Sequence, residues 1–264
     1  MKLTTEKERH MSELYIMRWP QNFTAIYNYG ATIQYHKDQS VSYANEVLSP
    51  GQTICSWSST TNYLASGTSP SLPLLKINQT YEIGIELEAD NPLPVQLQIS
   101  FLDKHQVVLA SYRGTQSHMT FTVPEGMISY EVQLINLRHH WLYFKNLFIG
   151  EIGAKESILK TQIDQHYEWV HTRPIRATDQ KCLHVIVNKG HRSIIPVSIS
   201  ESADYEQIFV YTDGQEVDVL IQSLSQILRL RPKAAISLEA GLGYHQLPSA
   251  FIAKLKKDLK PIKI

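Results

Sequence analysis

The stretch YEIGIELEADNPLPVQLQISF, residues 81–101, decides the fold class. Apolar side chains occupy every second position in both of its halves, which is typical of strands with one buried face and one solvated face. The segment ADNPLP between the halves is rich in residues that favour turns. These residues therefore predict two antiparallel strands joined by a turn. The apolar positions are Tyr81, Ile83, Ile85 and Leu87, then Val95, Leu97, Ile99 and Phe101.

The same alternation continues on the C-terminal side of this stretch. It occurs in MTFTV (119–123), YEVQL (130–134) and WLYFKNLFIG (141–150), with turn segments such as PEGM (124–127) between them. Several short strands at this spacing are typical of a β sandwich or jelly roll. We therefore predict a mainly β chain with an antiparallel β sandwich over residues 16–152, preceded by an N-terminal tail over 1–15. The residues expected in its core include Tyr81, Ile83, Val95, Leu97, Phe121, Leu134 and Phe144.

The pattern changes after residue 153. The segment AKESILKTQIDQHYEWVHTR (154–173) lacks Gly and Pro, and its apolar residues recur at near-helical spacing, which predicts a helical linker over 153–178. Two apolar runs of strand length follow, and then an amphipathic helix that ends at Pro232. A third strand and a last helix opened by Pro248 complete the pattern. Strands that alternate with helices in this way predict a small α/β domain over residues 179–264.

Composition excludes several functional classes. Lys plus Arg equal Asp plus Glu at 25 each, so no global charge favours nucleic acid or anionic lipid as a partner. The two cysteines, Cys55 and Cys182, make no disulfide framework. The first twenty residues contain no apolar stretch typical of a signal peptide, and no run reaches the roughly 18 apolar residues of a membrane span. We expect a soluble cytoplasmic protein.

Motifs for catalysis or metal binding are missing from the sequence. His139 and His140 are the nearest approach to a cluster, but adjacent strand residues point to opposite faces and cannot chelate together. Ser237 lacks the flanking glycines of a nucleophile elbow, and GLGYHQ (241–246) lacks the third glycine of a dinucleotide fingerprint. We therefore expect a protein that is not an enzyme, with no catalytic residue, metal or cofactor.

Aromatic residues beside amides and hydroxyls indicate a possible binding site. The segment SWSSTTNYLASGTSPSLPLL (56–75) places Trp57, Asn62 and Tyr63 among Ser and Thr, and Trp141 with Tyr143 supplies a second aromatic strand. Sugars have polar edges and apolar faces, so this mixture suits a glycan or a partner chain. Trp57 could equally complete the core after Ile54, and both interpretations stay open. The leucines at 72, 74 and 75 are expected in the core.

Several segments together resemble one known family. They are RWP (18–20), YNYGATIQY (27–35), NEVLSPGQTICSWSSTTNY (45–63), SPSLPLLKINQTYEI (69–83), FTVPEGMISYEVQLINL (121–137) and LYFKNLFIG (142–150). These segments resemble the third protein of the accessory Sec system. The resemblance implies a carbohydrate-binding-module-like β sandwich in a non-catalytic cytosolic subunit that supports export of serine-rich repeat glycoprotein adhesins.

The same resemblance implies partners. They are the two companion accessory Sec proteins, the accessory Sec ATPase and the adhesin itself, including its glycans, and membrane association would arise only through these partners. Two other functions stay open. One is a free-standing cytosolic carbohydrate-binding module, and the other is an esterase-like enzyme that uses the C-terminal α/β domain.

Overall fold

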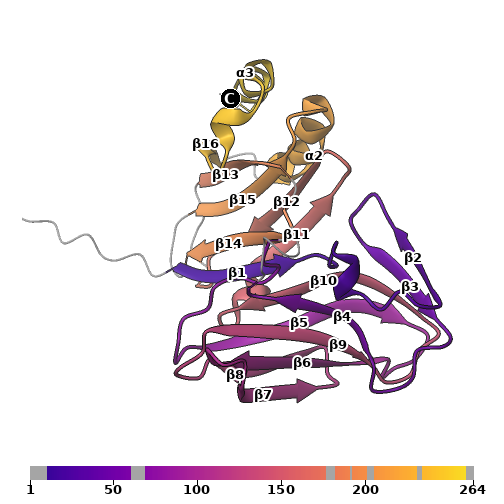
Figure 1. Cartoon of the computed structure of the whole chain (residues 1–264). Coiled ribbons are helices and arrows are strands. Elements are labelled where there is room, and N and C mark those ends of the chain that lie inside the picture. The colour runs from indigo at the N-terminus through magenta and orange to yellow at the C-terminus, as the bar shows by residue number, and fades with distance from the viewer. Residues whose placement is uncertain are drawn as a thin grey trace, which may run out of the picture. The chain divides into compact units, whose positions relative to one another are not determined.

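The structure, a computed structural model, describes residues 11–60, 69–176, 182–190, 192–200, 205–230 and 234–259. The chain forms two compact units (Figure 1). The first unit comprises Tyr15–Ile152 together with Ser193–Pro196. The second comprises the described residues of Met1–Leu14, Gly153–Arg192 and Val197–Ile264.

The first unit is a β sandwich, as the alternating apolar residues predict. Its larger sheet has seven strands in the order β14-β1-β10-β3-β2, with β5 paired to β10 and β8 paired to β5, and β1 and β14 contribute only Tyr15–Met17 and Ile194–Pro196 to this unit. The pairs of β10 with β3 and β5, β2 with β3 and β5 with β8 are antiparallel. Its strands are β1 (Met11–Met17), β2 (Ala31–Tyr35), β3 (Val41–Asn45), β5 (Thr80–Ala89), β8 (His118–Thr122), β10 (Trp141–Gly150) and β14 (Ile194–Ser200).

The smaller sheet of the sandwich has four strands in the order β4-β9-β6-β7, all antiparallel. Among the described strands β7 pairs only with β6, so it forms an edge of the sheet. A 3₁₀ turn, η1 (Phe23–Ala25), precedes β2. The strands are β4 (Thr53–Ser58), β6 (Val95–Leu102), β7 (Val108–Gly114) and β9 (Ser129–Asn136).

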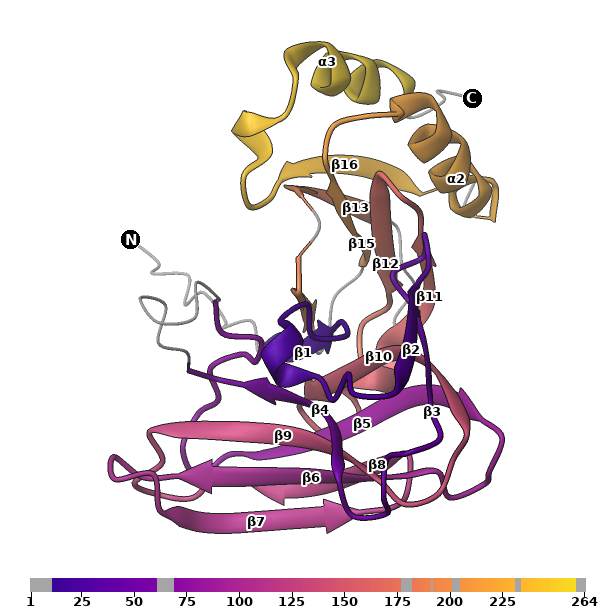
Figure 2. The ribbon, with the colours of Figure 1, turned by 45° about the vertical axis from the view of Figure 1, so that its right-hand side comes forward.

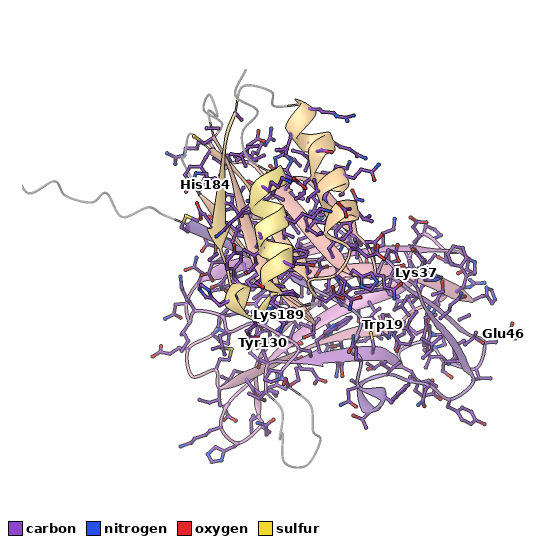
Figure 3. All side chains as sticks on the ribbon, turned by 90° about the horizontal axis from the view of Figure 1, so that it is seen from above. Trp19, Lys37, Glu46, Tyr130, His184 and Lys189 are labelled. Carbon is purple, nitrogen blue, oxygen red and sulfur yellow. The ribbon has the colours of Figure 1, made fainter. Side chains whose placement is uncertain are left out.

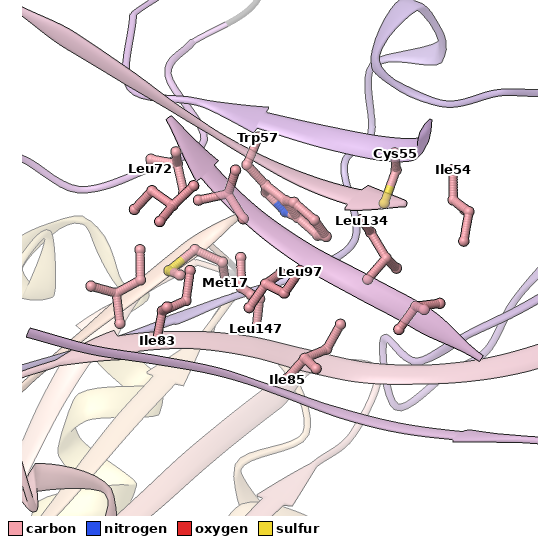
Figure 4. Packing of buried hydrophobic residues seen from close by; sticks show 14 of the residues in the cluster. Met17, Ile54, Cys55, Trp57, Leu72, Ile83, Ile85, Leu97, Leu134 and Leu147 are labelled. Carbon is pink, nitrogen blue, oxygen red and sulfur yellow. The ribbon is translucent and has the colours of Figure 1, made fainter. Parts of the chain in front are cut away.

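One hydrophobic core fills the space between the two sheets. Trp57, Leu97 and Leu134 from the smaller sheet meet Ile83 and Leu147 from the larger one (Figure 4). The seven residues predicted for the core are all buried, with at most 7% of each exposed, so this prediction is confirmed. The prediction that three leucines of the 72–75 segment lie in the core is correct for Leu72 and Leu75, which are buried. It is wrong for Leu74, which is 86% exposed.

The second unit contains a five-stranded sheet in the order β11-β12-β15-β13-β16. Strand β13 runs parallel to β15 and β16, whereas β12 runs antiparallel to β11 and β15. Helices α2 and α3 cover one face of β13, β15 and β16 (Figure 2). The elements are η2 (Ala154–Ser157), β11 (Ile158–Ile163), β12 (Tyr167–Thr172), β13 (Cys182–Lys189), β15 (Tyr205–Thr212), α2 (Val217–Leu230), β16 (Ala235–Ala240), η3 (Tyr244–Gln246) and α3 (Ser249–Asp258).

The prediction of a helical linker over 153–178 is wrong. Within the described residues 153–176, the short η2 is followed by the antiparallel pair β11 and β12, joined by a turn in which the N–H of Asp164 donates to the carbonyl of Tyr167. All six residues of β12 are buried, which suits a strand inside a sheet, and the run YEWVHT is rich in aromatic and β-branched residues. The absence of Gly and Pro did not identify a helix here, because Asp and His also form turns.

Two further strands lie where none was expected. Residues 11–15, assigned to an N-terminal tail, belong to β1 in the interior of the seven-stranded sheet. Strand β14 lies at an end of the same sheet and contains Pro196, which fits because proline in strands is confined to edges. No helix among the described residues is long and apolar enough to cross a membrane.

Candidate functional site

Trp57 belongs to the core of the sandwich and not to its surface. Its side chain is 1% exposed, its ring stacks on Phe144 with centroids 5.8 Å apart, and its Nε1 donates to the carbonyl of Arg18 over 2.8 Å. Along β4 the inward positions Cys55 and Trp57 alternate with Ser56 and Ser58, which point outward. The prediction that the Trp57 ring contacts a ligand is therefore wrong, and the alternative, core packing, holds. Asn62 and Tyr63 lie outside the described residues and stay predictions.

Trp141 and Tyr143 lie on the outer face of the seven-stranded sheet, on β10. Their neighbours Leu142 and Phe144 point into the core, so the two aromatic residues face away from it. Trp141 is 46% exposed. Across β3, Trp141 pairs with Ala44 and Tyr143 with Ser42, and these small side chains leave the aromatic rings uncovered from that strand.

A hydrogen-bond network fixes Tyr143. Its hydroxyl donates to Asp38 Oδ2 over 3.2 Å, and the Ser40 hydroxyl lies within hydrogen-bonding distance of both residues. The His36 ring lies 5.5 Å from the Tyr143 ring and is held by Ser42. Burial raises the pKa of Asp38, but hydrogen bonds from Ser40 and Tyr143 outweigh burial, and the pKa falls below its usual value. The outer face therefore offers an ionised carboxylate beside a fixed phenol and an exposed indole.

A concave region lies beside β4. The pocket has a volume of about 300 Å³, and residues of the first unit line it: Arg18, Trp19, Pro20, Gln21, Asn22, Ala25, Ser56, Ser58, Ser69, Ser71 and Ser193. Sequence reasoning identified the neighbouring aromatics but missed these residues. The signal was present, because alternation along β4 makes Ser56 and Ser58 the outward neighbours of Trp57.

The histidines form no metal centre in the part of the chain that the structure describes, which contains no cluster of three or more His, Cys, Asp or Glu suited to a metal. His139 is buried, whereas His140 is exposed and pairs with Asp90 over 2.7 Å. In the second unit, His184 contacts Glu239 and stacks on Tyr205, with centroids 4.2 Å apart. Both His184 and Lys189 of β13 are labelled in Figure 3.

Ser237 lies opposite His184 in the register of β13 and β16. Between these two described residues, however, no hydrogen bond joins the Ser237 hydroxyl to the imidazole. A serine hydrolase needs that contact so that the base can activate the nucleophile. This strand pair therefore gives the esterase alternative no support.

Comparison with known proteins identifies the relatives of the sandwich. The family described as Accessory Sec secretory system ASP3 matches residues 26–151. The accessory Sec system protein ASP3 of Streptococcus gordonii is 35% identical over 155 residues, which cover 58% of this chain and 96% of that protein. Its counterpart in Staphylococcus aureus (strain NCTC 8325 / PS 47) is 22% identical over 134 residues, covering 51% of this chain and 42% of that protein.

Solved structures give a consistent result. A chain in the crystal structure of accessory secretory proteins 1, 2 and 3 of Streptococcus pneumoniae matches with 32% identity and a TM-score of 0.50, covering 52% of this chain and 94% of that one. A chain of the glycosylation-associate protein complex of Streptococcus agalactiae shares the fold, with 19% identity and a TM-score of 0.51, over 86% of this chain and 70% of that one. The chain belongs to the ASP3 family and is a component of the accessory Sec system.

Proposed function

We propose that this chain is a non-catalytic subunit that assembles with the two companion accessory Sec proteins and supports export of serine-rich repeat glycoprotein adhesins. The observation that carries the proposal is the 35% identity to the Streptococcus gordonii protein over nearly its whole length. The match to a chain crystallised with accessory secretory proteins 1 and 2 supports the companions as partners. Delivery to the accessory Sec ATPase, a cytoplasmic location and membrane association only through partners are parts of the same proposal.

The edge strand β7 provides a surface for such assembly. Val107, Val108 and Leu109 at its start are 43–58% exposed, and Ile128 beside them is 63% exposed. The N–H of Ile128 donates to the carbonyl of Leu102, which pairs with Val108, so these side chains gather at one end of the smaller sheet. An unpaired edge with exposed apolar residues is a ready surface for another chain. We assign a companion accessory protein to this edge.

Co-expression with both companions tests assembly. We expect one complex in size-exclusion chromatography with light scattering, and we expect Leu109→Lys to weaken it. Leu93→Lys is the matched control. Leu93 is also an exposed leucine (55%), but it precedes the first residue of β6, whereas the apolar group of β7 lies beside the last residue of β6. A chain that stays monomeric beside its companions at micromolar concentration would contradict the proposal. It would then favour a free-standing carbohydrate-binding module.

The outer face of β10 provides a surface for the adhesin or its glycans. An exposed indole stacks well on the apolar face of a sugar, and the Asp38 carboxylate can accept hydrogen bonds from sugar hydroxyls. Because Tyr143 is already held by Asp38 and Ser40, little side-chain entropy would be lost on binding. We therefore propose Trp141 and Tyr143 as glycan or adhesin contacts.

A further inference from the structure

The pocket beside β4 contains polar groups that the protein leaves without partners. The Trp19 side chain is 2% exposed, and among the described residues its Nε1 has no acceptor. The hydroxyls of Ser56, Ser69 and Ser193, which also line the pocket, make no side-chain hydrogen bond within the described part of the chain. Ser56 is half-buried and Ser69 and Ser193 are exposed, so these hydroxyls are available to a ligand, whereas the Trp19 Nε1 is itself buried.

The backbone on one side of this pocket is held in place. The Trp57 indole donates to the carbonyl of Arg18, and the Arg18 N–H donates to the carbonyl of Ser193 over 3.1 Å. At the end of the same segment, Asn22 Oδ1 accepts from the Thr24 N–H and caps η1. The segment Arg18–Asn22 is therefore anchored at both ends before any ligand arrives.

The opposite side is equally fixed. The N–H of Ser71 donates to the carbonyl of Ser58 over 2.9 Å, and the N–H of Ser58 donates to the Ser71 hydroxyl over 3.0 Å. These reciprocal bonds tie Ser71 to the end of β4. A pocket with two anchored walls is preorganised, which lowers the entropic cost of binding.

The chemistry of the lining indicates the class of ligand. Arg18 is the one charged residue among the residues described as lining the pocket, and none of them is a carboxylate. The others supply hydroxyls, amides and an indole N–H beside the apolar surfaces of Pro20 and Ala25. Hydroxyls and amides both donate and accept, which suits a neutral ligand with many hydroxyl groups. The volume of about 300 Å³ lies at the lower end of the range for small-molecule sites.

We propose that this pocket binds one neutral monosaccharide unit of a glycan through the hydroxyl and amide groups that line it, with the buried Trp19 indole beside the bound sugar. The proposal rests on the glycan contact proposed above and adds a second, concave site to the open face of β10. Trp57 then acts as a positioning residue, because it holds the Arg18 carbonyl and never touches the sugar.

Indole resonances distinguish the two sites directly. The chain has four tryptophans. Trp57 and Trp169 donate to Arg18 and Ser223, whereas Trp141 is exposed and Trp19 lines the pocket. In ¹H–¹⁵N spectra of the full chain titrated with glucose, galactose or N-acetylglucosamine, we expect saturable movement of the Trp19 Nε1 signal with at least one sugar. Signals are assigned by Trp→Phe variants.

Variants make the test specific to the pocket. Ser56→Phe fills the pocket and should abolish movement of the Trp19 signal, while Ser111→Phe, at an exposed position on β7, should leave it unchanged. If thermal melting shows that Ser56→Phe does not fold, Gln21→Ala at the exposed rim should weaken binding about two- to tenfold by removing a hydrogen bond.

Two outcomes overturn the proposal. A Trp19 signal that stays still with all three sugars would do so, and so would movement that survives the Ser56→Phe substitution in a folded protein. If the Trp141 signal moves and the Trp19 signal does not, the pocket is excluded while the glycan contact at β10 stands. Assembly with the companions is measured separately, so failure of the pocket leaves that proposal intact.

Discussion

The Trp57 indole and the main-chain carbonyl of Arg18 are joined by a buried hydrogen bond of 2.8 Å, thirty-nine residues apart in the sequence. This bond links the interior of the sandwich to the wall of the serine-lined pocket, since Arg18 lines that pocket. A core residue thus determines the shape of a surface site, and its substitution should affect folding before it affects binding.

Substitution of Trp57 should therefore be strongly destabilising. Trp57→Ala removes a fully buried ring and should lower the free energy of unfolding by about 3–5 kcal/mol. Trp57→Phe keeps an aromatic ring against Phe144 but leaves the Arg18 carbonyl without its donor, which should cost about 1–3 kcal/mol. Urea denaturation of both variants measures the difference. An unchanged midpoint for Trp57→Ala would show that the ring is not in the core.

Trp141→Ala should weaken binding and leave stability nearly unchanged, in contrast to Trp57→Ala. Because the side chain is 46% exposed, we expect its loss to change the free energy of unfolding by no more than about 0.5 kcal/mol. If Trp141 is a central contact for a glycan or the adhesin chain, binding should weaken by about 2 kcal/mol or more. Isothermal titration with glycosylated adhesin fragments tests this. Val47→Ala, which also removes an exposed apolar side chain, is the control and should bind normally.

Stability of the first unit should decrease in mild acid because of His139. Burial lowers the pKa of His139 below its ordinary value of 6.5, and the Pro94 carbonyl and the Asp90 carboxylate oppose this only in part. His139 therefore binds a proton more readily in the unfolded chain than in the native state. The free energy of unfolding should be highest above pH 6.5 and should decrease as the pH falls below that value. Urea denaturation between pH 7.5 and 5.5 measures this slope.

The control for this prediction is a pair of histidine variants. His139→Gln should reduce the dependence on pH, whereas His105→Gln, in an exposed turn, should retain it. Equal slopes for the wild type and a folded His139→Gln variant would rule out His139 as the source.

The two thiols should differ in reactivity. Cys55 is completely buried, and burial raises the pKa of its thiol well above the ordinary value, so it has little thiolate at neutral pH. Cys182, at the start of β13, is only partly buried. Iodoacetamide at pH 8 should label Cys182 of the native protein first, and peptide mass mapping identifies the site. Rapid labelling of Cys55 without denaturant would contradict its place in the core.

Apolar residues at every second position were sufficient to predict most of the sandwich strands, because each of these strands has one buried face and one solvated face. The alternation around Ile83 and Leu97 identifies both strands and their buried sides, and both residues are buried. Strand β12 could not be found in this way. All six of its residues are buried, so it has no solvated face and its sequence shows no alternation of apolar and polar residues. A fully buried strand and a buried helix look alike in apolar content, and the turn at residues 164–166 carries no glycine or proline.

The site was harder to predict than the fold. Sequence reasoning singled out the segment that contains Ser56 and Ser58, which line the proposed pocket. It selected Trp57 for its chemistry, although alternation along β4 directs that ring inward. Trp19 and Ser193 could not be brought together from the sequence, because the pairing of β1 with β14 and the hydrogen bond between the Arg18 N–H and the Ser193 carbonyl arise only in the folded chain.

The position of β14 has a consequence for how the chain is made. Ser193–Pro196 belong to the first unit, although some forty residues of the second unit precede them. A ribosome adds about 5–20 residues per second, so the nascent sandwich must wait several seconds after Ile152 for this strand. During that interval β1, its neighbour in the finished sheet, is an open edge. A gene fragment that stops at residue 152 would make this temporary edge permanent, and its product should be prone to self-association.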